Sequence, residues 1–419
     1  MKVLLISTNR LRYMSPPLPL GIGYILSNLD ERHEVRVLDL MFLDGFEKEI
    51  KKTIEDFDPE AIGISIRNID NTSLIDTKFF LPIDREVIKV CKESRAKIVL
   101  GGPGFSIMPK ECLSYLKGDM GIVGEGEIAF NALLRRIEAR ENLGDIPGLI
   151  TKDGVSQREF IAPLDLLKPP NRKCFNLLHY YGKEWSATIQ SKRGCPFRCI
   201  YCCNPLIEGK KIRMRSPEKV VDELERMEGK DKISFVDAIF NNPIEHAEAI
   251  CGEIIERGLN LSWNCTLNPK FADEHLVGLM AEAGCASVGL SSDSGSAKIL
   301  KKLRKNFSLE DIVKCRRYCG DNDIDTYCFL LLGGPGEDKK TVKESASFME
   351  ELGPKTLHLG VGIRIFPGCE IEEIARRERA LPLDADLLYP TFYLSPQVKG
   401  WIVDYVNEKV DREGWDLAP

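Results

Sequence analysis

The sequence has no uninterrupted apolar run that approaches the ~20 residues of a bilayer-spanning helix. It begins MKVLLIS, without the basic segment, apolar core and cleavage site of an export signal. It also lacks an excess of positive charge, since the formal net charge is −6, and this disfavours a nucleic-acid surface. These absences predict a cytoplasmic protein with no membrane segment and no nucleic-acid partner.

What is present fits a globular enzyme of two or three domains. The chain has 419 residues, of which 43% are hydrophobic and 29% are charged, and this balance is typical of a soluble protein. Disulfides are rare in the cytoplasm, so the fourteen cysteines are expected to be metal ligands and buried hydrophobic residues.

Residues 1–150 alternate short β-branched runs with helix-like segments. The runs are nearly continuous in hydrophobicity, as in strands that are covered on both faces. This order predicts a doubly wound, Rossmann-like α/β domain with a parallel sheet. The expected strands are 2–6, 34–40, 61–66, 97–102 and 120–124.

A second alternation follows a linker at 151–185, which carries little periodicity beyond a possible small hairpin. Residues 186–370 contain six βα units of about 30 residues, which predict a partial (β/α)6 barrel rather than a full barrel of eight. Residues 371–419 form a C-terminal extension. The expected barrel strands are 186–190, 232–237, 261–266, 286–291, 326–332 and 356–364.

Three cysteines with the spacing C-x3-C-x2-C follow the first barrel strand, at the rim where barrel sites are built: Cys195, Cys199 and Cys202. Three thiolates can hold three irons of a [4Fe–4S] cluster and leave the fourth iron open to a ligand. The alternative is structural zinc, which needs four closed ligands. The sequence has no second CxxC downstream, and the adjacent Cys203 cannot easily chelate the same ion.

This spacing, with Tyr201 before the last cysteine, resembles the radical S-adenosylmethionine (SAM) superfamily. The resemblance implies that SAM binds the open iron and is cleaved to a 5′-deoxyadenosyl radical. It also assigns Asp237, after the second barrel strand, to the SAM ammonium group and Asp293, after the fourth, to the ribose hydroxyls. Gly334, after the fifth strand, lets backbone approach the nucleoside. Ordinary caps and turns are the alternative for these residues.

The first domain lacks the GxGxxG that a dinucleotide-binding strand would need. Its polar and glycine-rich segments lie where strands end, which is where open α/β sheets bind ligands. They resemble the cobalamin-binding domain found before many radical SAM modules. The residues that this resemblance assigns to the cofactor are Leu20, Gly21, Ser65, Arg67, Gly101, Gly102, Pro103, Gly124, Glu125, Gly126 and Glu127.

A histidine that ligates cobalt from below has the signature Asp-x-His-x-x-Gly. Residues 273–278 match it literally, but they lie on an expected barrel helix, so we interpret the match as chance. The loop after the first strand contains no histidine, and the lower face of the cobalamin is therefore expected to be histidine-free. Tyr13 and Met14 on that loop either cover the cobalt or pack as ordinary loop residues.

Together, residues 1–370 resemble the cobalamin-dependent radical SAM enzymes of the methyltransferase type. The resemblance implies that the adenosyl radical abstracts hydrogen from an unactivated carbon, which then takes a methyl group from methylcobalamin. It requires SAM and an external electron donor. Arg364 is expected either to hold a substrate carboxylate or amide or to pair with an acidic residue of the barrel.

Two other functions stay open: a non-methylating cobalamin-linked radical SAM enzyme, such as a cyclase or ring-contracting enzyme, and a non-catalytic cobalamin or SAM sensor. Related enzymes methylate peptides, antibiotic precursors, lipids and side chains of methyl-coenzyme M reductase. The expected substrate is a peptide or protein side chain, including those of methyl-coenzyme M reductase.

Overall fold

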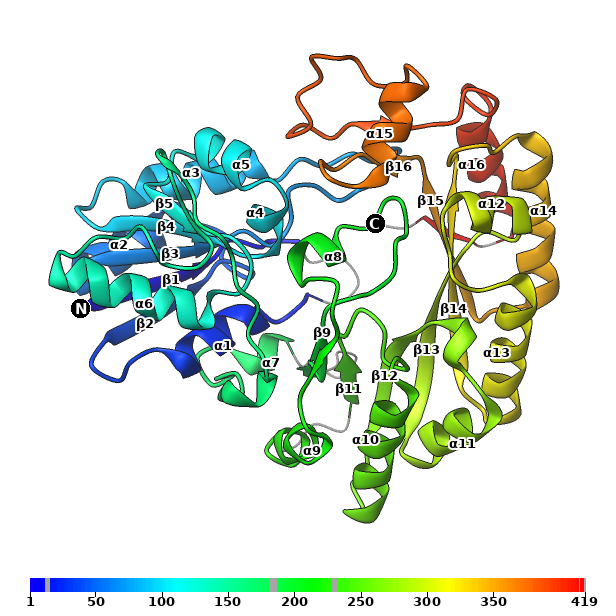
Figure 1. Ribbon diagram of the computed structural model, residues 1–419, viewed down its shortest axis with the longest axis horizontal. Coiled ribbons are helices and arrows are strands. Elements are labelled where there is room, and N and C mark those ends of the chain that lie inside the picture. Colours follow the sequence, from blue (N-terminus) through cyan, green and yellow to red (C-terminus); the bar gives the residue numbers. More distant parts are fainter. Residues whose placement is uncertain (12–15, 181–186, 228–231, 414, 418–419) are drawn as a thin grey trace. The chain divides into compact units, whose positions relative to one another are not determined.

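The computed structural model describes residues 1–11, 16–180, 187–227, 232–413 and 415–417 (Figure 1). Tyr13 and Met14 lie outside the described residues. The contacts divide the chain into two compact units. The first contains residues 1–71, 79–185 and 206–208, and the second contains residues 72–78, 186–205 and 209–419.

The first unit is built on a seven-stranded sheet in the order β2-β1-β3-β4-β5-β6-β7. The strands β1 to β5 are parallel, and β6 and β7 continue the sheet as an antiparallel hairpin. This is the doubly wound arrangement that the sequence predicts. The strands are β1 (Lys2–Ser7), β2 (Glu34–Asp39), β3 (Ala61–Ser65), β4 (Lys97–Gly101), β5 (Met120–Ile122), β6 (Leu149–Thr151) and β7 (Gly154–Val155).

Helices of the first unit pack in neighbouring groups: α1 lies against α6, and α3 lies between α2 and α5 with contacts to both. Each helix buries an apolar stripe on the sheet, as in α6, where Ala129, Phe130, Leu133 and Leu134 are buried. These helices are α1 (Leu20–Asn28), α2 (Phe46–Phe57), α3 (Leu81–Cys91), α4 (Pro103–Ile107), α5 (Pro109–Leu116) and α6 (Gly126–Ala139).

The segment expected to be a linker belongs to the first unit and packs on it. It contains the 3-10 helix η1 (Leu164–Leu166) and the short helix α7 (Leu177–Tyr180). Tyr180 is 1% exposed, lies edge-on to Phe42, and donates its hydroxyl to Asp39 at the end of β2. The described part of this segment is thus a strap anchored in the core rather than a free connection.

The second unit contains a parallel seven-stranded sheet in the order β18-β15-β14-β13-β12-β11-β8. Six of its strands, β8 and β11 to β15, belong to successive βα units and form the partial barrel that the sequence predicts. The two-residue strand β18 is added at one edge. The strands are β8 (Ala187–Ile189), β11 (Lys232–Phe235), β12 (Ser262–Leu267), β13 (Cys285–Asp293), β14 (Asp325–Leu332), β15 (Thr356–Val361) and β18 (Asp416–Leu417).

Helices cover the outer side of this curved sheet (Figure 1). Consecutive helices lie side by side, α9 beside α10, α10 beside α11, and α11 beside α13. The helices are α8 (Asn204–Ile207), α9 (Pro217–Glu225), α10 (Ile244–Glu256), η2 (Pro269–Phe271), α11 (Glu274–Glu282), α12 (Ala297–Lys302), α13 (Leu309–Asp321) and α14 (Lys339–Leu352).

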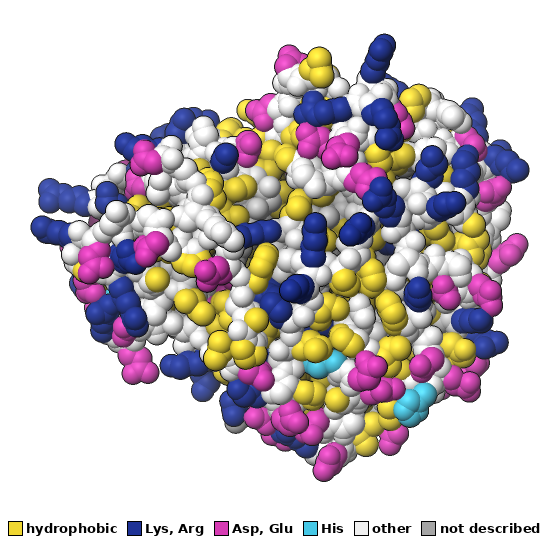
Figure 2. All heavy atoms as spheres, in the orientation of Figure 1, with side chains coloured by type: hydrophobic (Ala, Val, Ile, Leu, Met, Phe, Trp, Pro, Cys, Tyr) yellow, Lys and Arg dark blue, Asp and Glu magenta, His cyan; other side chains and the backbone are white. Residues whose placement is uncertain are grey.

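The C-terminal extension continues the second unit through α15 (Glu370–Arg377) and α16 (Ile402–Glu413). Two small ladders complete the unit. They join β9 (Lys192–Arg193) to β10 (Arg213–Met214) and β16 (Ile363–Arg364) to β17 (Phe392–Tyr393), both antiparallel. Among the described residues, no helix combines the length and apolar character needed to cross a membrane. Figure 2 shows basic and acidic side chains interspersed over the face in view.

Candidate active site

The cysteine loop leaves the sheet after β8 and β9 and is fixed by a glycine. Gly194 has a φ of +93°, and a Cβ at this position would overlap the carbonyl oxygen of Lys211. Only glycine fits both conditions. The amide of Cys195 donates to the carbonyl oxygen of Gly209 at 3.1 Å, so the loop starts in one defined direction.

The middle of the loop is held by backbone contacts with two distant helices. The amide of Ile200 donates to the carbonyl of Leu303 at the end of α12 (3.3 Å), and its carbonyl accepts from the amide of Ile371 in α15 (2.9 Å). The ring of Phe197 stacks on that of Phe271 at 6.0 Å. The C-terminal extension therefore takes part in shaping the cysteine loop.

The three thiols differ in exposure: Cys195 is buried, whereas Cys199 and Cys202 are partly exposed. Within the described residues, no three His, Cys, Asp or Glu side chains are placed to share one metal ion. A single zinc ion would need such a set, whereas each thiolate of a [4Fe–4S] cluster binds a different iron. The three thiols on this loop fit the cluster chemistry better than they fit zinc.

The side chain of Asp293 contacts Tyr201 of the cysteine loop. Lys305, which the sequence analysis did not predict, binds to the same carboxylate. Tyr201 donates its hydroxyl to Asp293 Oδ2, and Lys305 Nζ lies 2.8 Å from the same oxygen. The side chains of Lys305 and Asp293 are only 5% and 7% exposed. Asp293 has a left-handed backbone with φ of +58° at the end of β13.

The buried ion pair has clear electrostatic consequences. Burial lowers the pKa of Lys305, but Asp293 and the Cys199 thiol outweigh it and leave the pKa raised above its usual range. Burial and then Asp293 raise the pKa of the Tyr201 phenol well above its usual range. Burial raises the pKa of the Cys199 thiol, and Lys305 opposes this by lowering it. Lys305 is thus a fixed positive charge next to two of the three thiols.

Asp237 holds the start of the cysteine loop. Its Oδ1 accepts from the amides of Ser191 (2.8 Å) and Lys192 (3.1 Å), and its Oδ2 accepts from the Ser191 hydroxyl (2.5 Å). Lys192 Nζ donates to the carbonyl of Phe240 at 2.6 Å. Burial raises the pKa of Asp237, against lowering by Lys192 and the other donors. This geometry suits a residue that positions the cysteine loop. Asp237 would have this task in addition to its predicted contact with SAM.

Gly334 lies in a loop that folds around a buried carboxylate. Glu337 is fully buried, and its Oε2 accepts from the amides of Gly333 and, at 2.9 Å, Gly334. Burial raises the pKa of Glu337 to about 7, against lowering by those two amides. Gly333 has a φ of +91°, and a Cβ there would collide with Leu394. The glycines shape this loop, and Glu337 was not singled out by the sequence.

Arg364 lies in β16, just after the last long strand of the barrel. Its guanidinium donates to the carbonyl oxygens of Ile365 (2.6 Å) and Leu387 (2.9 Å), and the side chain is buried against Phe366. These contacts tie the end of the barrel to the C-terminal extension. They suit an anchor of that extension, and the two expected roles, a grip on substrate or a partner for an acidic barrel residue, stay predictions.

In the first unit, the loops after β3, β4 and β5 come together. Gly102 has a φ of +96°, and a Cβ there would lie 2.6 Å from the carbonyl oxygen of Ile66 and 3.0 Å from Ser65 Oγ. The amide of Ile66 donates to the carbonyl of Gly101 at 2.8 Å. The expected positions Ser65, Gly101 and Gly102 are therefore neighbours, and they present backbone rather than side chains.

Ser106, which the sequence did not single out, joins the third loop to them. Its hydroxyl donates to the carbonyl of Gly102 (2.9 Å) and accepts from the amide of Gly124 (2.9 Å). Gly124 also has a positive φ, of +92°. Only the placement of α4 beside the β5 loop reveals this contact, since a serine in a helix carries no distinctive sequence signal.

The remaining first-unit positions lie on helix starts. Leu20 and Gly21 open α1, and Pro103 opens α4. Arg67 follows β3 and is exposed. Gly126 and Glu127 open α6, with Glu127 buried. Glu125 precedes α6, and its Oε2 accepts from the amide of Ile161 at 2.7 Å, so this carboxylate holds the strap that follows β7.

The literal Asp-x-His-x-x-Gly match lies on a barrel helix, as predicted. Asp273 is the N-cap of α11, and its side chain accepts from the amide of Leu276 at 2.8 Å. His275 is 74% exposed, 3.7 Å from Glu248. The aspartate of the match is therefore explained by helix capping.

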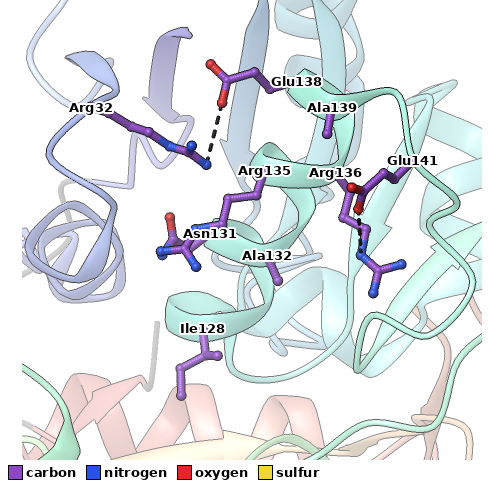
Figure 3. Close-up of a pocket in the computed structure, with 9 residues that line it drawn as sticks. All are labelled: Arg32, Ile128, Asn131, Ala132, Arg135, Arg136, Glu138, Ala139 and Glu141. Carbon is purple, nitrogen blue, oxygen red and sulfur yellow. Dashed lines mark ion pairs between the residues drawn. The ribbon is translucent and has the colours of Figure 1, made fainter.

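One surface cavity of about 630 Å³ lies over α6 (Figure 3). Its three arginines are paired with carboxylates: Arg32 with Glu138 at 3.5 Å, Arg135 with Asp30 at 3.0 Å, and Arg136 with Asp145 at 2.7 Å. This cavity contains none of the predicted site residues, and its paired charges leave it without a distinct chemistry.

Comparison with known proteins identifies the two units. The B12 binding domain matches residues 11–134, and the radical SAM superfamily matches residues 189–349. The solved structure of the radical S-adenosylmethionine methyltransferase TsrM from Kitasatospora setae, with tryptophan and a SAM analogue bound, superposes with a TM-score of 0.86. It is 26% identical, and the match covers 95% of this chain and 86% of that one. The chain belongs to the cobalamin-dependent radical SAM methyltransferases.

Relatives by sequence agree with this assignment. An uncharacterized methyltransferase of Pyrococcus horikoshii is 27% identical over 350 residues, covering 80% of this chain and 73% of the relative. A tryptophan 2-C-methyltransferase of Streptomyces laurentii is 25% identical, covering 87% of this chain and 73% of the relative. The cofactors of this methyltransferase are a [4Fe–4S] cluster, SAM and cobalamin.

Proposed function

We propose that this methyltransferase adds a methyl group to an unactivated carbon of a peptide or protein side chain. The reaction type depends on one observation above all, the thiol loop of Cys195, Cys199 and Cys202 beside the buried Lys305–Asp293 pair. When bound, the cluster supplies an electron to SAM, and cobalamin supplies a methyl group.

The residues of the chain fit the three cofactors by type. The three cysteines would hold three irons of the cluster and leave the fourth open to SAM. Asp293, Tyr201, Asp237 and Gly334 would surround SAM. In the first unit, the glycine-lined loops of Ser65, Gly101, Gly102 and Gly124 would receive cobalamin, because a Cβ at Gly102 would fill the space between them.

The residues of the chain then have distinct tasks. Asp237 fixes the start of the thiol loop through Ser191 and Lys192. Lys305 neutralises Asp293 and holds its carboxylate in one place. Glu337 folds the Gly333–Gly334 backbone into a tight loop, so that a nucleoside can approach it without a side chain in between.

The proposal includes an external electron donor, because reductive cleavage of SAM consumes an electron, and a cytoplasmic location, where thiols stay reduced. Methyl-coenzyme M reductase is included among the protein substrates to be tested. A non-methylating reaction is the other candidate, since an anaerobic magnesium-protoporphyrin IX monomethyl ester cyclase of Rubrivivax gelatinosus is 28% identical over 346 residues.

The test is to incubate the reduced, cofactor-loaded enzyme with SAM deuterated in its methyl group and with a cell extract. Peptides and small molecules are then analysed by mass spectrometry, in parallel with 5′-deoxyadenosine. We expect a peptide that carries the deuterated methyl group on carbon. Purified unmodified methyl-coenzyme M reductase is a separate arm of the same experiment.

Two outcomes would contradict the proposal. Labelled small molecules without labelled peptides would reject the peptide substrate and keep the methyltransferase. Release of 5′-deoxyadenosine without any labelled product would favour the cyclase type of reaction.

A further inference from the structure

The segment that carries the thiol loop is strongly basic. Between residues 192 and 215 it has a single acidic residue, Glu208, whereas the whole chain has a formal net charge of −6. The positive charge around the thiols is therefore a local feature of this segment. Its seven cations are Lys192, Arg193, Arg198, Lys210, Lys211, Arg213 and Arg215.

Three of these cations are exposed: Arg198, Lys210 and Lys211. Within the part of the chain that the structure describes, their side chains make no salt bridge and no hydrogen bond. Arg215 differs, because it is buried and pairs with Glu223 at 2.7 Å. A cation that stabilises the fold thus has its partner, whereas the three exposed cations are available to a partner from outside.

The three exposed cations lie around one short stretch of the thiol loop. Arg198 is between the first two cysteines of the loop. The backbone of Gly209 and Lys211 runs against Gly194 and Cys195, through the two contacts that fix the start of the loop. We call the set of Arg198, Lys210 and Lys211 the basic patch.

Acidic residues on the elements that contact the thiol loop do not cancel the charge of the basic patch. Glu370 of α15 is paired with Arg304 at 2.7 Å. Asp273 and Glu274 lie at the start of α11, where the positive end of the helix dipole offsets part of their charge. The basic patch therefore keeps an excess of positive charge.

An exposed positive surface beside an electron-accepting site suits an acidic electron-donor protein. Such partners meet over small interfaces, below ~1,200 Å² in total, and complementary charge steers them into a productive orientation. A nucleic acid is a weaker match, because nucleic-acid-binding proteins commonly make about 6–10 phosphate contacts, which is more than three cations supply.

We propose that the basic patch is the docking surface for a small acidic electron-donor protein that carries a reduced flavin or iron–sulfur group. In the docked complex one electron passes from the donor to the oxidised cluster, so the donor loses one electron, the cluster gains one, and no bond forms between the proteins. The inference rests on the proposed function, because that function includes an external electron donor.

The test measures reduction of the cluster by an acidic flavodoxin. The anaerobic cofactor-loaded enzyme is mixed with reduced flavodoxin at low ionic strength, and stopped-flow absorbance follows the loss of the iron–sulfur signal. In the triple variant Arg198→Gln/Lys210→Gln/Lys211→Gln we expect the bimolecular rate constant to fall about tenfold, because electrostatic steering is lost. The difference should shrink at high salt, where the charges are screened.

Two variants serve as controls. Arg198→Lys/Lys210→Arg/Lys211→Arg keeps the three charges and should keep the rate. Lys48→Gln/Lys52→Gln/Lys92→Gln also removes three positive charges, from exposed lysines in and after helices α2 and α3 of the first unit, and should likewise keep the rate.

Reduced methyl viologen, a small cation, is the reductant of opposite charge. It should reduce the cluster of the Gln variant of the basic patch at an equal or higher rate than that of the unmodified enzyme, which shows that the cluster is intact. A fall in the rate with both reductants would overturn the inference, because the substitutions would then act through the cluster itself.

Equal flavodoxin rates in the Gln variant of the basic patch and in the first-unit control would also overturn the inference. Loss of tRNA binding in that patch variant would then assign the charges to a nucleic acid. The assay needs neither substrate nor methyl transfer, so failure of the proposed reaction leaves these rates unchanged. An unmodified enzyme without any iron–sulfur signal would refute the proposed function itself.

Discussion

The two units prepare the carboxyl ends of their strands for ligands in different ways. In the first unit, glycines with positive φ bring bare backbone together, and Ser106 links the loops through its hydroxyl. In the second unit, buried charges hold the loops: Asp237 binds Ser191 and Lys192, and Lys305 binds Asp293. Backbone surfaces suit a bulky neutral ring system, whereas fixed charges suit a charged cofactor and a metal cluster.

The comparison makes the two cofactor sites separable by mutation. Damage to the glycine-lined loops should release cobalamin and spare the cluster, and damage to the charged loops should do the reverse. Four predictions test this separation, in order of decreasing effect.

Cys199→Ala should abolish iron–sulfur absorbance and reduce 5′-deoxyadenosine formation at least ~100-fold, because an iron loses its thiolate. Cobalamin binding, measured by its visible absorbance after gel filtration, should remain. Cys203→Ala is the matched control and should keep the cluster, since Cys203 is predicted not to be a ligand. Loss of the cluster in both variants would assign Cys203 to the metal.

Lys305→Met should destabilise the second unit by about 3–5 kcal/mol, because it leaves the buried carboxylate of Asp293 without its cation. Thermal unfolding under anaerobic conditions measures this effect, and cobalamin binding should be unaffected. Lys340→Met, at an 85% exposed side chain on α14, should change stability by less than ~0.5 kcal/mol. Equal stabilities of the two variants would refute the structural importance of the buried pair.

Gly102→Ala should cost about 2–3 kcal/mol, because the new Cβ meets the Ile66 carbonyl and the residue keeps a positive φ. We expect weaker cobalamin retention, measured spectroscopically, with normal cluster content. Gly252→Ala is the control, because no heavy atom lies within 4 Å of its would-be Cβ and it lies within α10 of the second unit. If Gly102→Ala retains cobalamin fully, the glycine-lined loops are not the binding surface.

Asp84→Asn should change the pH dependence of the free energy of unfolding. This is the smallest of the four expected effects. Burial raises the pKa of Asp84 to about 7, against lowering by the Thr8 hydroxyl, whereas the unfolded pKa is 3.8. The folded state therefore binds the carboxyl proton of Asp84 more tightly than the unfolded state does. The stabilisation that this proton gives the folded state is present at low pH and is lost as the pH rises through about 7.

Between pH 5.5 and 8, the unmodified protein should lose about 2 kcal/mol of unfolding free energy relative to Asp84→Asn. Denaturant unfolding at both pH values measures this difference. Asp58→Asn, at an exposed helix end, should show no such change. Parallel curves for Asp84→Asn and the unmodified protein would show that Asp84 does not titrate in this range.

The fold was largely predictable because buried parallel strands leave continuous apolar runs in sequence, as at Val3–Ile6. The thiol loop was predictable from spacing alone. Lys305 was not, because it lies 103 positions after Cys202 in an ordinary lysine-rich segment, and only the fold of the α12 end carries it to Asp293.

Arg364 is the opposite case, a residue that the sequence singled out but whose contacts it did not reveal. Besides the carbonyl of Ile365, its guanidinium donates to the carbonyl oxygens of Leu387 and Thr391, in a segment without periodicity. The segment 151–185 was predicted to be a linker, and the Tyr180–Asp39 contact that anchors its described part joins residues 141 positions apart. Long-range polar contacts of this kind leave no local pattern in the sequence.

The double attachment of Ile200 limits where the C-terminal extension can be exchanged. This one residue of the thiol loop is bonded both to the barrel and to the start of the segment that follows it, through Leu303 and Ile371. A chimera that exchanges the tail at residue 370 would replace half of this clamp, whereas a junction beyond Arg377 would leave it intact. An exchanged tail is therefore expected to spare the thiol loop when the junction follows α15.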